Sequence, residues 1–410
     1  MLIKNVRIEN AEGVSDLRIE NGYICEITQN AKAGDGEEVI DGQGGLLLPP
    51  FVDSHVHLDT CLSLDATGPN ESGTLFEGIR IWSAYRKTLD KEEVQERAMR
   101  TVGLYRDRGV QYIRSHVDIS NDLTAFKALL ELKERVSDQM EIQLVAFPQD
   151  GVFSSEQVKR NLEEALSMGA DVAGGIPHFE FTREHGEKSI HFIVELAKKY
   201  GRLVDMHCDE IDDEQSRFLE VLAAKAYESG LGERVSASHT TAMHSYNGAY
   251  CDKLFRILRM SGINIIANPL VNVNLQGRFD SYPRRRGITR IKELLQNEIN
   301  VSLGHDDIYD PFYPMGDGNM VEVLSMGLHL CHMMGYHELN EAWRMITYNG
   351  AKTLHLDQRD YGIQAGKPAN FNIFRADSFF DVLRSDREII HSVRKGVRIG
   401  GKARKEGTEK

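Results

Sequence analysis

The chain has 410 residues, of which 41% are hydrophobic and 27% charged, a balance typical of a folded globular protein rather than a disordered or collagen-like chain. Its 49 basic and 62 acidic side chains give a net charge of −13, so binding to nucleic acid or to a membrane surface is not expected. Five widely spaced cysteines without a CxxC pair, and no run of roughly 18 apolar residues, predict a cytoplasmic protein without disulfides, signal peptide or membrane span.

Short apolar segments rich in β-branched residues alternate with longer amphipathic stretches through the middle of the chain. Eight such segments predict strands: 45–54, 109–117, 141–147, 170–177, 202–207, 234–239, 262–271 and 299–305. Helical periodicity marks several stretches between them: 91–108, 122–136, 155–168 and 189–200. Gly109, Gly169 and Gly201 follow three of these stretches as helix stops. Eight strand–helix units predict an α/β fold, a (β/α)8 barrel of the TIM type over residues 49–360.

The two ends of the chain differ from the barrel segment. Apolar and polar positions alternate within residues 1–48, around a turn at Asn21-Gly22, and again within residues 361–410, around glycines such as Gly396. Turns of this kind connect short strands. We therefore expect both termini to pair into one small β-sandwich domain beside the barrel.

Polar residues follow the last apolar residue of several predicted strands, which is where catalytic groups lie in such a barrel. The first strand ends in His55-Val56-His57, and an extended backbone places both imidazoles on one side, roughly 7 Å apart at the backbone. The fifth, sixth and eighth strands end in residues of the same kinds: His207, His239 and Asp306. Each histidine alone is equally consistent with a hydrogen-bonded structural residue. Together they predict a divalent metal site of three imidazoles and one carboxylate, with a further imidazole beside it.

Residues near this predicted site indicate hydrolysis. A metal held by imidazoles and a carboxylate lowers the pKa of bound water and supplies hydroxide near neutral pH. Glu210 is placed to give a proton to a departing nitrogen, although a solvated loop carboxylate is the alternative for a residue in the acidic run 209–214. Gln149, after the third strand, offers an amide to the edge of a heterocycle or is a turn residue. The fourth strand offers no lysine to bridge two metals, so one metal is expected.

Several familiar motifs are absent. The sequence contains no GxSxG, GxxxxGK[ST] or PCxxC, and no GxGxxG after a strand. Their absence argues against serine hydrolases, nucleotide-phosphate binding, Rossmann domains and cysteine-ligated nucleobase deaminases. The basic run 284–286 is the one patch suited to an anion, and we interpret it as a solvated or intersubunit loop.

Longer stretches around the strand ends carry a family resemblance. They are PPFVDSHVHLDT (49–60), SGTLFEG (72–78), VAFPQ (145–149), IPHFEFTRE (176–184), HCDEIDDEQSRF (207–218), ASHTTAMHSYNGAY (237–250), NPLVN (268–272) and GHDD (304–307). These stretches resemble the bacterial cytosine deaminases of the amidohydrolase superfamily, and the resemblance covers nearly the whole chain.

The resemblance implies a mechanism and a set of site residues. It implies four ligands for one divalent metal ion, Fe2+ or Zn2+: His55, His57, His207 and Asp306. It implies three contacts to the pyrimidine: Phe147, Gln149 and Asp307. His239 would orient the attacking hydroxide, Glu210 would carry a proton to the ring nitrogen, and Asp306 would take the first proton from the bound water. The implied reaction is attack on C4 of a free cytosine-type base with loss of ammonia, in a homo-oligomer.

One position departs from the family pattern. The family usually has tryptophan after the Asp-Pro pair that follows the metal aspartate, whereas here Asp310-Pro311 precedes Phe312. If the space left by the smaller ring faces C5 of the base, a 5-methyl group fills it, and one methylene is worth about 1–3 kcal/mol, or roughly 10–200-fold in preference. We therefore expect Phe312 to contact substrate and 5-methylcytosine to be a good substrate, with repacking of Phe312 against Tyr313 as the alternative.

Two other functions remain open from the sequence. Within the superfamily, the substrate is alternatively another aminated ring such as isoguanine or an aminotriazine. In a different class, the barrel is a non-catalytic scaffold that binds a metal or ligand. The scaffold is disfavoured because the chain keeps every expected ligand, acid and base.

Overall fold

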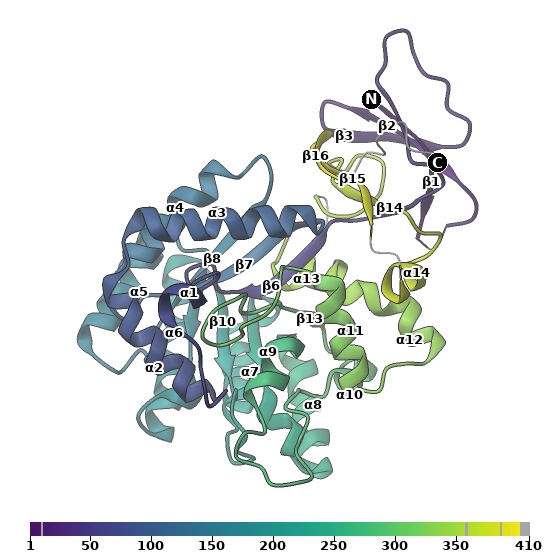
Figure 1. Cartoon of the computed structure of the whole chain (residues 1–410). Helices are drawn as coiled ribbons and strands as arrows, with labels where there is room; N and C mark the ends of the chain where they lie inside the picture. The colour runs from purple at the N-terminus through teal and green to yellow at the C-terminus, as the bar shows by residue number, and fades with distance from the viewer. Residues whose placement is uncertain (10, 357–359, 386–387, 402–410) are drawn as a thin grey trace.

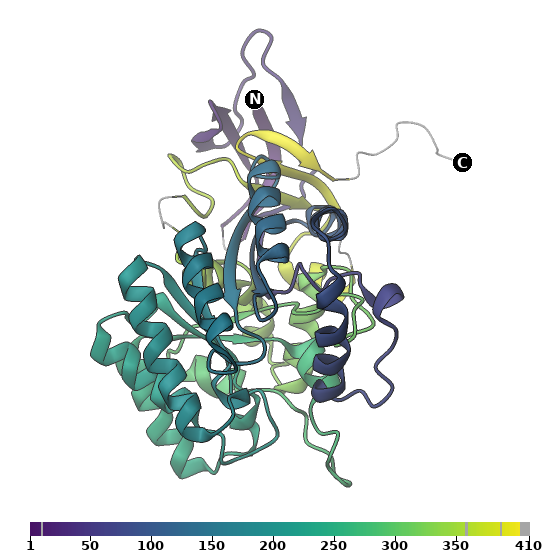
Figure 2. The ribbon, with the colours of Figure 1, turned by 90° about the vertical axis from the view of Figure 1, so that its left-hand side faces the viewer.

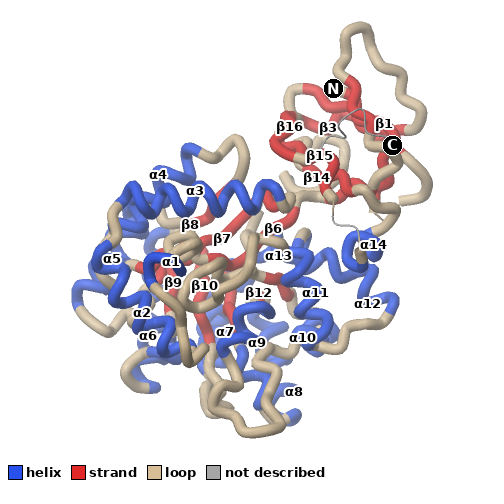
Figure 3. The backbone as a smooth tube through the Cα atoms, viewed as in Figure 1, coloured by secondary structure: helices blue, strands red, loops and turns tan. Residues whose placement is uncertain are grey.

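Two β-sheets organise the protein. The computed structural model describes residues 1–9, 11–356, 360–385 and 388–401. Figure 1 shows a large barrel covered by helices and, at its upper right, a smaller sheet where segments from both ends of the chain lie together. Figure 3 shows the same division by secondary structure, with nearly all helices around the barrel. Within the described ranges, no helix combines the length and apolar character needed to cross a membrane.

Eight parallel strands form the barrel, and each is hydrogen-bonded to the next along the chain. They are β6 (Phe51–Val56), β7 (Val110–Asp118), β8 (Glu141–Phe147), β9 (Val172–Gly175), β10 (Leu203–Cys208), β11 (Val235–His239), β12 (Asn264–Ala267) and β13 (Val301–Leu303). A parallel bridge between Val56 and Asp306 joins the two ends of this sheet. The predicted (β/α)8 barrel is therefore confirmed, and its closure lies at the predicted metal ligands.

Helices surround the barrel, as the turned view in Figure 2 shows. The α-helices are α1 (Leu64–Thr67), α2 (Leu75–Tyr85), α3 (Lys91–Asp107), α4 (Thr124–Arg135), α5 (Glu156–Met168), α6 (Arg183–Tyr200), α7 (Phe218–Ser229), α8 (Gly248–Ser261), α9 (Pro269–Leu275), α10 (Ile291–Gln296), α11 (Met320–Leu330), α12 (Tyr336–Glu341) and α13 (Tyr348–Thr353). Short 3-10 turns are η1 (Arg86–Thr88), η2 (Pro177–Phe179), η3 (Gly232–Arg234), η4 (Thr241–Ser245) and η5 (Ala342–Ile346). Side-chain caps begin several helices, for example at Asp90 and Ser155, because they satisfy free backbone N–H groups. Gly169 and Gly201 end α5 and α6 in the left-handed conformation, as predicted.

The smaller sheet combines strands from both ends of the chain. Its strands are β1 (Leu2–Ile8), β2 (Ser15–Glu20), β3 (Tyr23–Thr28), β4 (Val39–Asp41), β5 (Leu46–Leu48), β14 (Phe371–Phe374), β15 (Ile389–Arg394) and β16 (Val397–Gly400), with α14 (Phe379–Arg384) between β14 and β15. They follow the order β16-β15-β14-β5-β1-β2-β3, and β4 pairs with β1. Apolar side chains from both ends form a core of their own, including Ile3, Leu17, Phe371 and Val393. The expected sheet from both termini is confirmed, while its limits stay a prediction and residues 402–410 lie outside the described part.

Two of the predicted strands have wrong boundaries, and in both cases proline residues are the reason. The segment 45–54 is not one strand, because Pro49-Pro50 separates β5 of the smaller sheet from β6 of the barrel. The strand predicted over 262–271 was too long for the same reason, because β12 ends at Ala267 and Pro269 begins α9. Proline lacks the N–H that a strand ladder needs but suits the first turn of a helix.

Candidate metal centre and active site

Four predicted ligands converge where the barrel closes. His57 Nε2 lies 3.3 Å from His55 Nε2 and 3.2 Å from His207 Nε2. Asp306 Oδ1 lies 3.4 Å from His55 Nε2 and 3.5 Å from His57 Nε2. Ligand atoms bound at 2.0–2.1 Å around a tetrahedral ion are about 3.3 Å apart. These atoms therefore have the spacing of a metal coordination shell, and the donor set fits a divalent ion.

Burial makes this cluster unfavourable without a cation. Desolvation lowers the pKa of His57 to about 3, and burial together with neighbouring imidazoles holds the pKa of His55 and His207 well below the usual range. Neutral imidazole is the form that binds metals. Burial, and then the Glu210 carboxylate, raises the pKa of Asp306 well above its usual value. A bound cation offsets the cost of burying that carboxylate.

Hydrogen bonds of the barrel backbone position the ligands. The Asp306 amide donates to the His55 carbonyl at 2.8 Å, and the His57 amide donates to the Asp306 carbonyl at 3.2 Å. These two hydrogen bonds join the end of β6, the first strand of the barrel, to the segment that follows β13, the last strand, and they do so at the ligand residues themselves. Asp306 and His239 have left-handed backbone angles, with φ of 70° and 69°. Such angles are uncommon for residues other than glycine and cluster at functional sites.

An acid and an imidazole lie beside the cluster. Glu210 follows β10, and its Oε1 atom lies 3.3 Å from Nδ1 of His239 at the end of β11. The same His239 nitrogen lies 3.7 Å from Asp306 Oδ2. Burial raises the pKa of Glu210 well above its usual value, which favours the protonated form that a general acid needs.

One cavity brings most of the predicted site residues together. It is lined by His57, Leu75, Gln149, His207, Glu210, His239, Leu275, Asp306, Asp307 and Phe312. Phe147 has a different place: its ring stacks on His207 with 4.0 Å between centroids and is fully buried. A substrate contact by Phe147 stays a prediction.

Sequence reasoning missed several neighbours of the site. Asn268 and Asn272 place their Nδ2 atoms 3.2 and 3.0 Å from Nδ1 of His239. They lie four residues apart at the start of α9, so the helix brings both side chains to the same side. The prediction of a strand over 262–271 did not include this helix. Leu75 and Leu275 line the cavity from α2 and α9, and no local pattern marks them.

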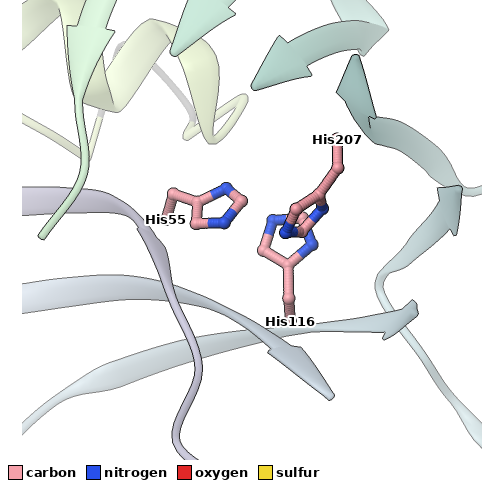
Figure 4. A group of neighbouring side chains, drawn as sticks. All are labelled: His55, His116 and His207. Atoms are coloured by element: carbon pink, nitrogen blue, oxygen red, sulfur yellow. The ribbon is translucent and has the colours of Figure 1, made fainter. Parts of the chain in front are cut away.

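His116, two residues before the end of β7, was also missed. Figure 4 shows its ring beside those of His55 and His207. It stacks on His55 with 3.9 Å between centroids and 28° between planes, and it meets His207 edge-on at 4.7 Å. Candidate ligand atoms of all three lie within 4.8 Å of one another, but stacked rings direct their in-plane lone pairs side by side. His116 therefore supports the ligand His55 rather than sharing its ion.

Barrel, ligand cluster and adjacent acid define a metal-dependent hydrolase. The sequence profile of the amidohydrolase family matches residues 38–402, so the chain belongs to the amidohydrolase family, and the family resemblance of the strand-end motifs is confirmed. The crystal structure of 5-methylcytosine deaminase from Klebsiella pneumoniae liganded with 5-fluorocytosine is 46% identical, covers 100% of this chain and 99% of that chain, and has a TM-score of 0.96.

Other relatives act on different rings. N-isopropylammelide isopropyl amidohydrolase from Pseudomonas sp. (strain ADP) is 28% identical over 92% of this chain and 91% of that protein. Pterin deaminase from Rhizobium rhizogenes is 26% identical over 93% of this chain and 88% of that protein.

Proposed function

We propose that this amidohydrolase is a metal-dependent deaminase of free cytosines, which converts 5-methylcytosine to thymine and cytosine to uracil with release of ammonia. The observation that carries the proposal is the buried Glu210 carboxyl, 3.3 Å from His239, which lines one cavity together with three of the four expected metal ligands. Likeness to a 5-methylcytosine deaminase at 46% identity supports it. The net charge of −13 favours a neutral free base over a base within a polyanion.

One divalent ion, Fe2+ or Zn2+, fits the ligand set. His55, His57, His207 and Asp306 would hold it, since imidazole with one carboxylate suits either metal. When bound, such an ion activates water as the nucleophile for hydrolysis. The identity of the ion depends on which metal the cell supplies.

The protein side chains would move the protons. His239, held by Asn268 and Asn272, orients the attacking water at C4 of the base. Asp306 receives the first proton at Oδ2, the oxygen that faces His239. Glu210 would give its proton to the adjacent ring nitrogen and, as a carboxylate, would then take the proton of the new C4 hydroxyl as the C4=O bond forms. The proton held by Asp306 would pass to the amino group, and the C4–N bond breaks as ammonia leaves. Gln149 presents its amide to the N–H and C=O edge of the pyrimidine.

Phe312 is proposed to set the preference for a 5-methyl group. Its backbone is held on both sides, because its amide donates to Asp310 Oδ1 at 2.9 Å and its carbonyl accepts from Asn274 Nδ2 at 3.0 Å. Its ring packs on α2, where a Cβ added to Gly78 would lie 2.7 Å from the ring. On the α2 side the ring therefore has no space to move, and we place this wall of the cavity against C5 of the base.

The alternative substrates are other aminated rings, isoguanine or an aminotriazine. This alternative stays open because two relatives are named for N-isopropylammelide and for pterin rather than for cytosine. We place the enzyme in the cytoplasm because all five cysteines are free thiols, and a homo-oligomer stays a prediction.

Substrate turnover tests the proposal directly. The metal-loaded protein is assayed for ammonia release with cytosine, 5-methylcytosine, isoguanine and an aminotriazine side by side, and products are identified by mass. We expect uracil and thymine, with the higher kcat/KM for 5-methylcytosine. Turnover of isoguanine or the aminotriazine alone would establish the alternative, and no turnover of any of the four rings would overturn the proposed substrates.

A further inference from the structure

We infer that Ser238 and Asp205 are positioning residues for the metal centre, which fix the ring of His55 through a buried chain of hydrogen bonds anchored by Arg114. The inference rests on the metal site proposed above. It concerns side chains that do not touch the ion or the substrate.

The chain of hydrogen bonds begins at the ligand itself. His55 Nδ1 lies 2.9 Å from Ser238 Oγ, and the Ser238 hydroxyl donates to Asp205 Oδ1 at 2.7 Å. Because that hydroxyl uses its proton on Asp205, its oxygen accepts from His55 Nδ1–H. The proton of the neutral imidazole is therefore on Nδ1, and the lone pair on Nε2 faces His57 and Asp306. This is the tautomer that a metal ligand requires.

Arg114 holds the far end of the chain. Its Nη1 atom donates to Asp205 Oδ2 at 2.8 Å and to Ser236 Oγ at 3.2 Å. Its Nη2 atom donates to the Thr353 carbonyl at 2.8 Å and to Gln143 at 3.1 Å. The guanidinium thus connects three barrel strands, β8, β10 and β11, to α13 beneath the ligand cluster.

Stability alone does not explain this ion pair. Arg114 is 1% exposed and Asp205 is fully buried, and well-packed apolar side chains of similar volume often stabilise a core as well as a buried pair does. The geometry points to orientation instead, because the one hydroxyl between this pair and the metal centre is hydrogen-bonded to a ligand.

His116 completes the support of His55. It covers one face of the His55 ring at 3.9 Å, and its Nε2 atom lies 3.8 Å from Asp205 Oδ2. Stacking resists tilting of the His55 ring, and the bond to Ser238 resists its rotation. The contrast with His207 is clear: its Nδ1 atom has no hydrogen-bond partner among the described residues, and it is held by stacking on Phe147.

Zn2+ affinity tests the inference, measured by competition with a chromophoric chelator. Ser238→Ala removes the bond to His55, and loss of such an outer partner typically costs 10–100-fold in metal affinity. Ser236→Ala is the matched control, since it removes a hydroxyl from the same strand and the same Arg114 without touching His55. We expect a 10–100-fold weaker Kd for Ser238→Ala, a change under twofold for Ser236→Ala, and similar urea unfolding midpoints for both metal-free variants.

Two further results keep the test decisive. Ser238→Thr keeps the hydroxyl and should recover most of the affinity. Ser238→Gly, which also lacks the hydroxyl, replaces Ser238→Ala in the comparison with Ser236→Ala if the alanine variant does not fold. Equal Zn2+ affinity of Ser238→Ala and Ser236→Ala would overturn the positioning role. Wild-type protein that binds no Zn2+ would instead overturn the metal site of the proposed function, so the two failures are distinguishable.

Discussion

The metal side of the pocket and the wall opposite it are built differently. His55, His207 and Asp306 lie at or next to the ends of barrel strands. Hydrogen bonds across the barrel hold His55 and Asp306, and stacking on Phe147 holds His207. The opposite wall, formed by Leu75, Leu275 and Phe312, comes from helices and a loop outside the strands and packs through apolar contacts. The barrel strands thus hold the residues expected to bind the metal, while helices and loops outside the strands shape the part of the pocket that is expected to select the substrate ring.

The largest expected effect is on the metal side. Glu210→Gln keeps the shape but loses the proton, and general acid–base catalysis contributes about 10²–10⁴-fold. We expect kcat to fall by about that factor while bound metal stays at the wild-type level. Glu214→Gln, an exposed residue of the same loop, is the matched control and should keep wild-type kcat. Unchanged turnover of Glu210→Gln would remove this carboxyl from the mechanism.

Removal of the metal should lower the melting temperature through the ligand cluster and not through the apolar wall that contains Phe312. A ligand at 100 times its Kd stabilises the native state by about 2.7 kcal/mol, which raises Tm by several degrees. Thermal melts with and without Zn2+ should show this shift in the wild type and in Phe312→Trp, because the wall does not bind metal. His57→Ala should lose the shift. A shift that survives in His57→Ala would place the ion elsewhere.

The same difference explains how much the sequence could predict. Residues at strand ends were found because a parallel barrel brings its carboxyl ends to one face whatever the loops do. Leu75 contacts the pocket, and Gly78 lies against Phe312, only through the placement of α2, which no local pattern encodes. Asp205 and His116 lie within buried strands, where periodicity does not say which side chains face a partner in the core. Tertiary packing decides these positions.

Substrate preference should change when the wall changes. Phe312→Trp enlarges the ring that we place against C5, and filling the space of one methyl group is worth roughly 10–200-fold. The ratio of kcat/KM for 5-methylcytosine to that for cytosine should fall by a factor in this range, with metal content unchanged. Phe181→Trp, at an aromatic residue that is 93% exposed, is the control. An unchanged ratio in Phe312→Trp would mean that Phe312 only packs against its neighbours.

The smallest effect should come from the helix behind the wall. Gly78→Ala places a Cβ 2.7 Å from the Phe312 ring, so the ring must shift toward the cavity, and side-chain displacements of this kind cost about 0.5–1.5 kcal/mol, or roughly 2–10-fold. Gly103→Ala is the matched control, because Gly103 lies in α3 with nothing within 4 Å of an added Cβ. Both substitutions gain similar helix propensity, so helix propensity does not account for a difference between them. The 5-methylcytosine to cytosine ratio should fall only in Gly78→Ala; an equal loss of both activities there would show that the ring blocks entry rather than contacting C5.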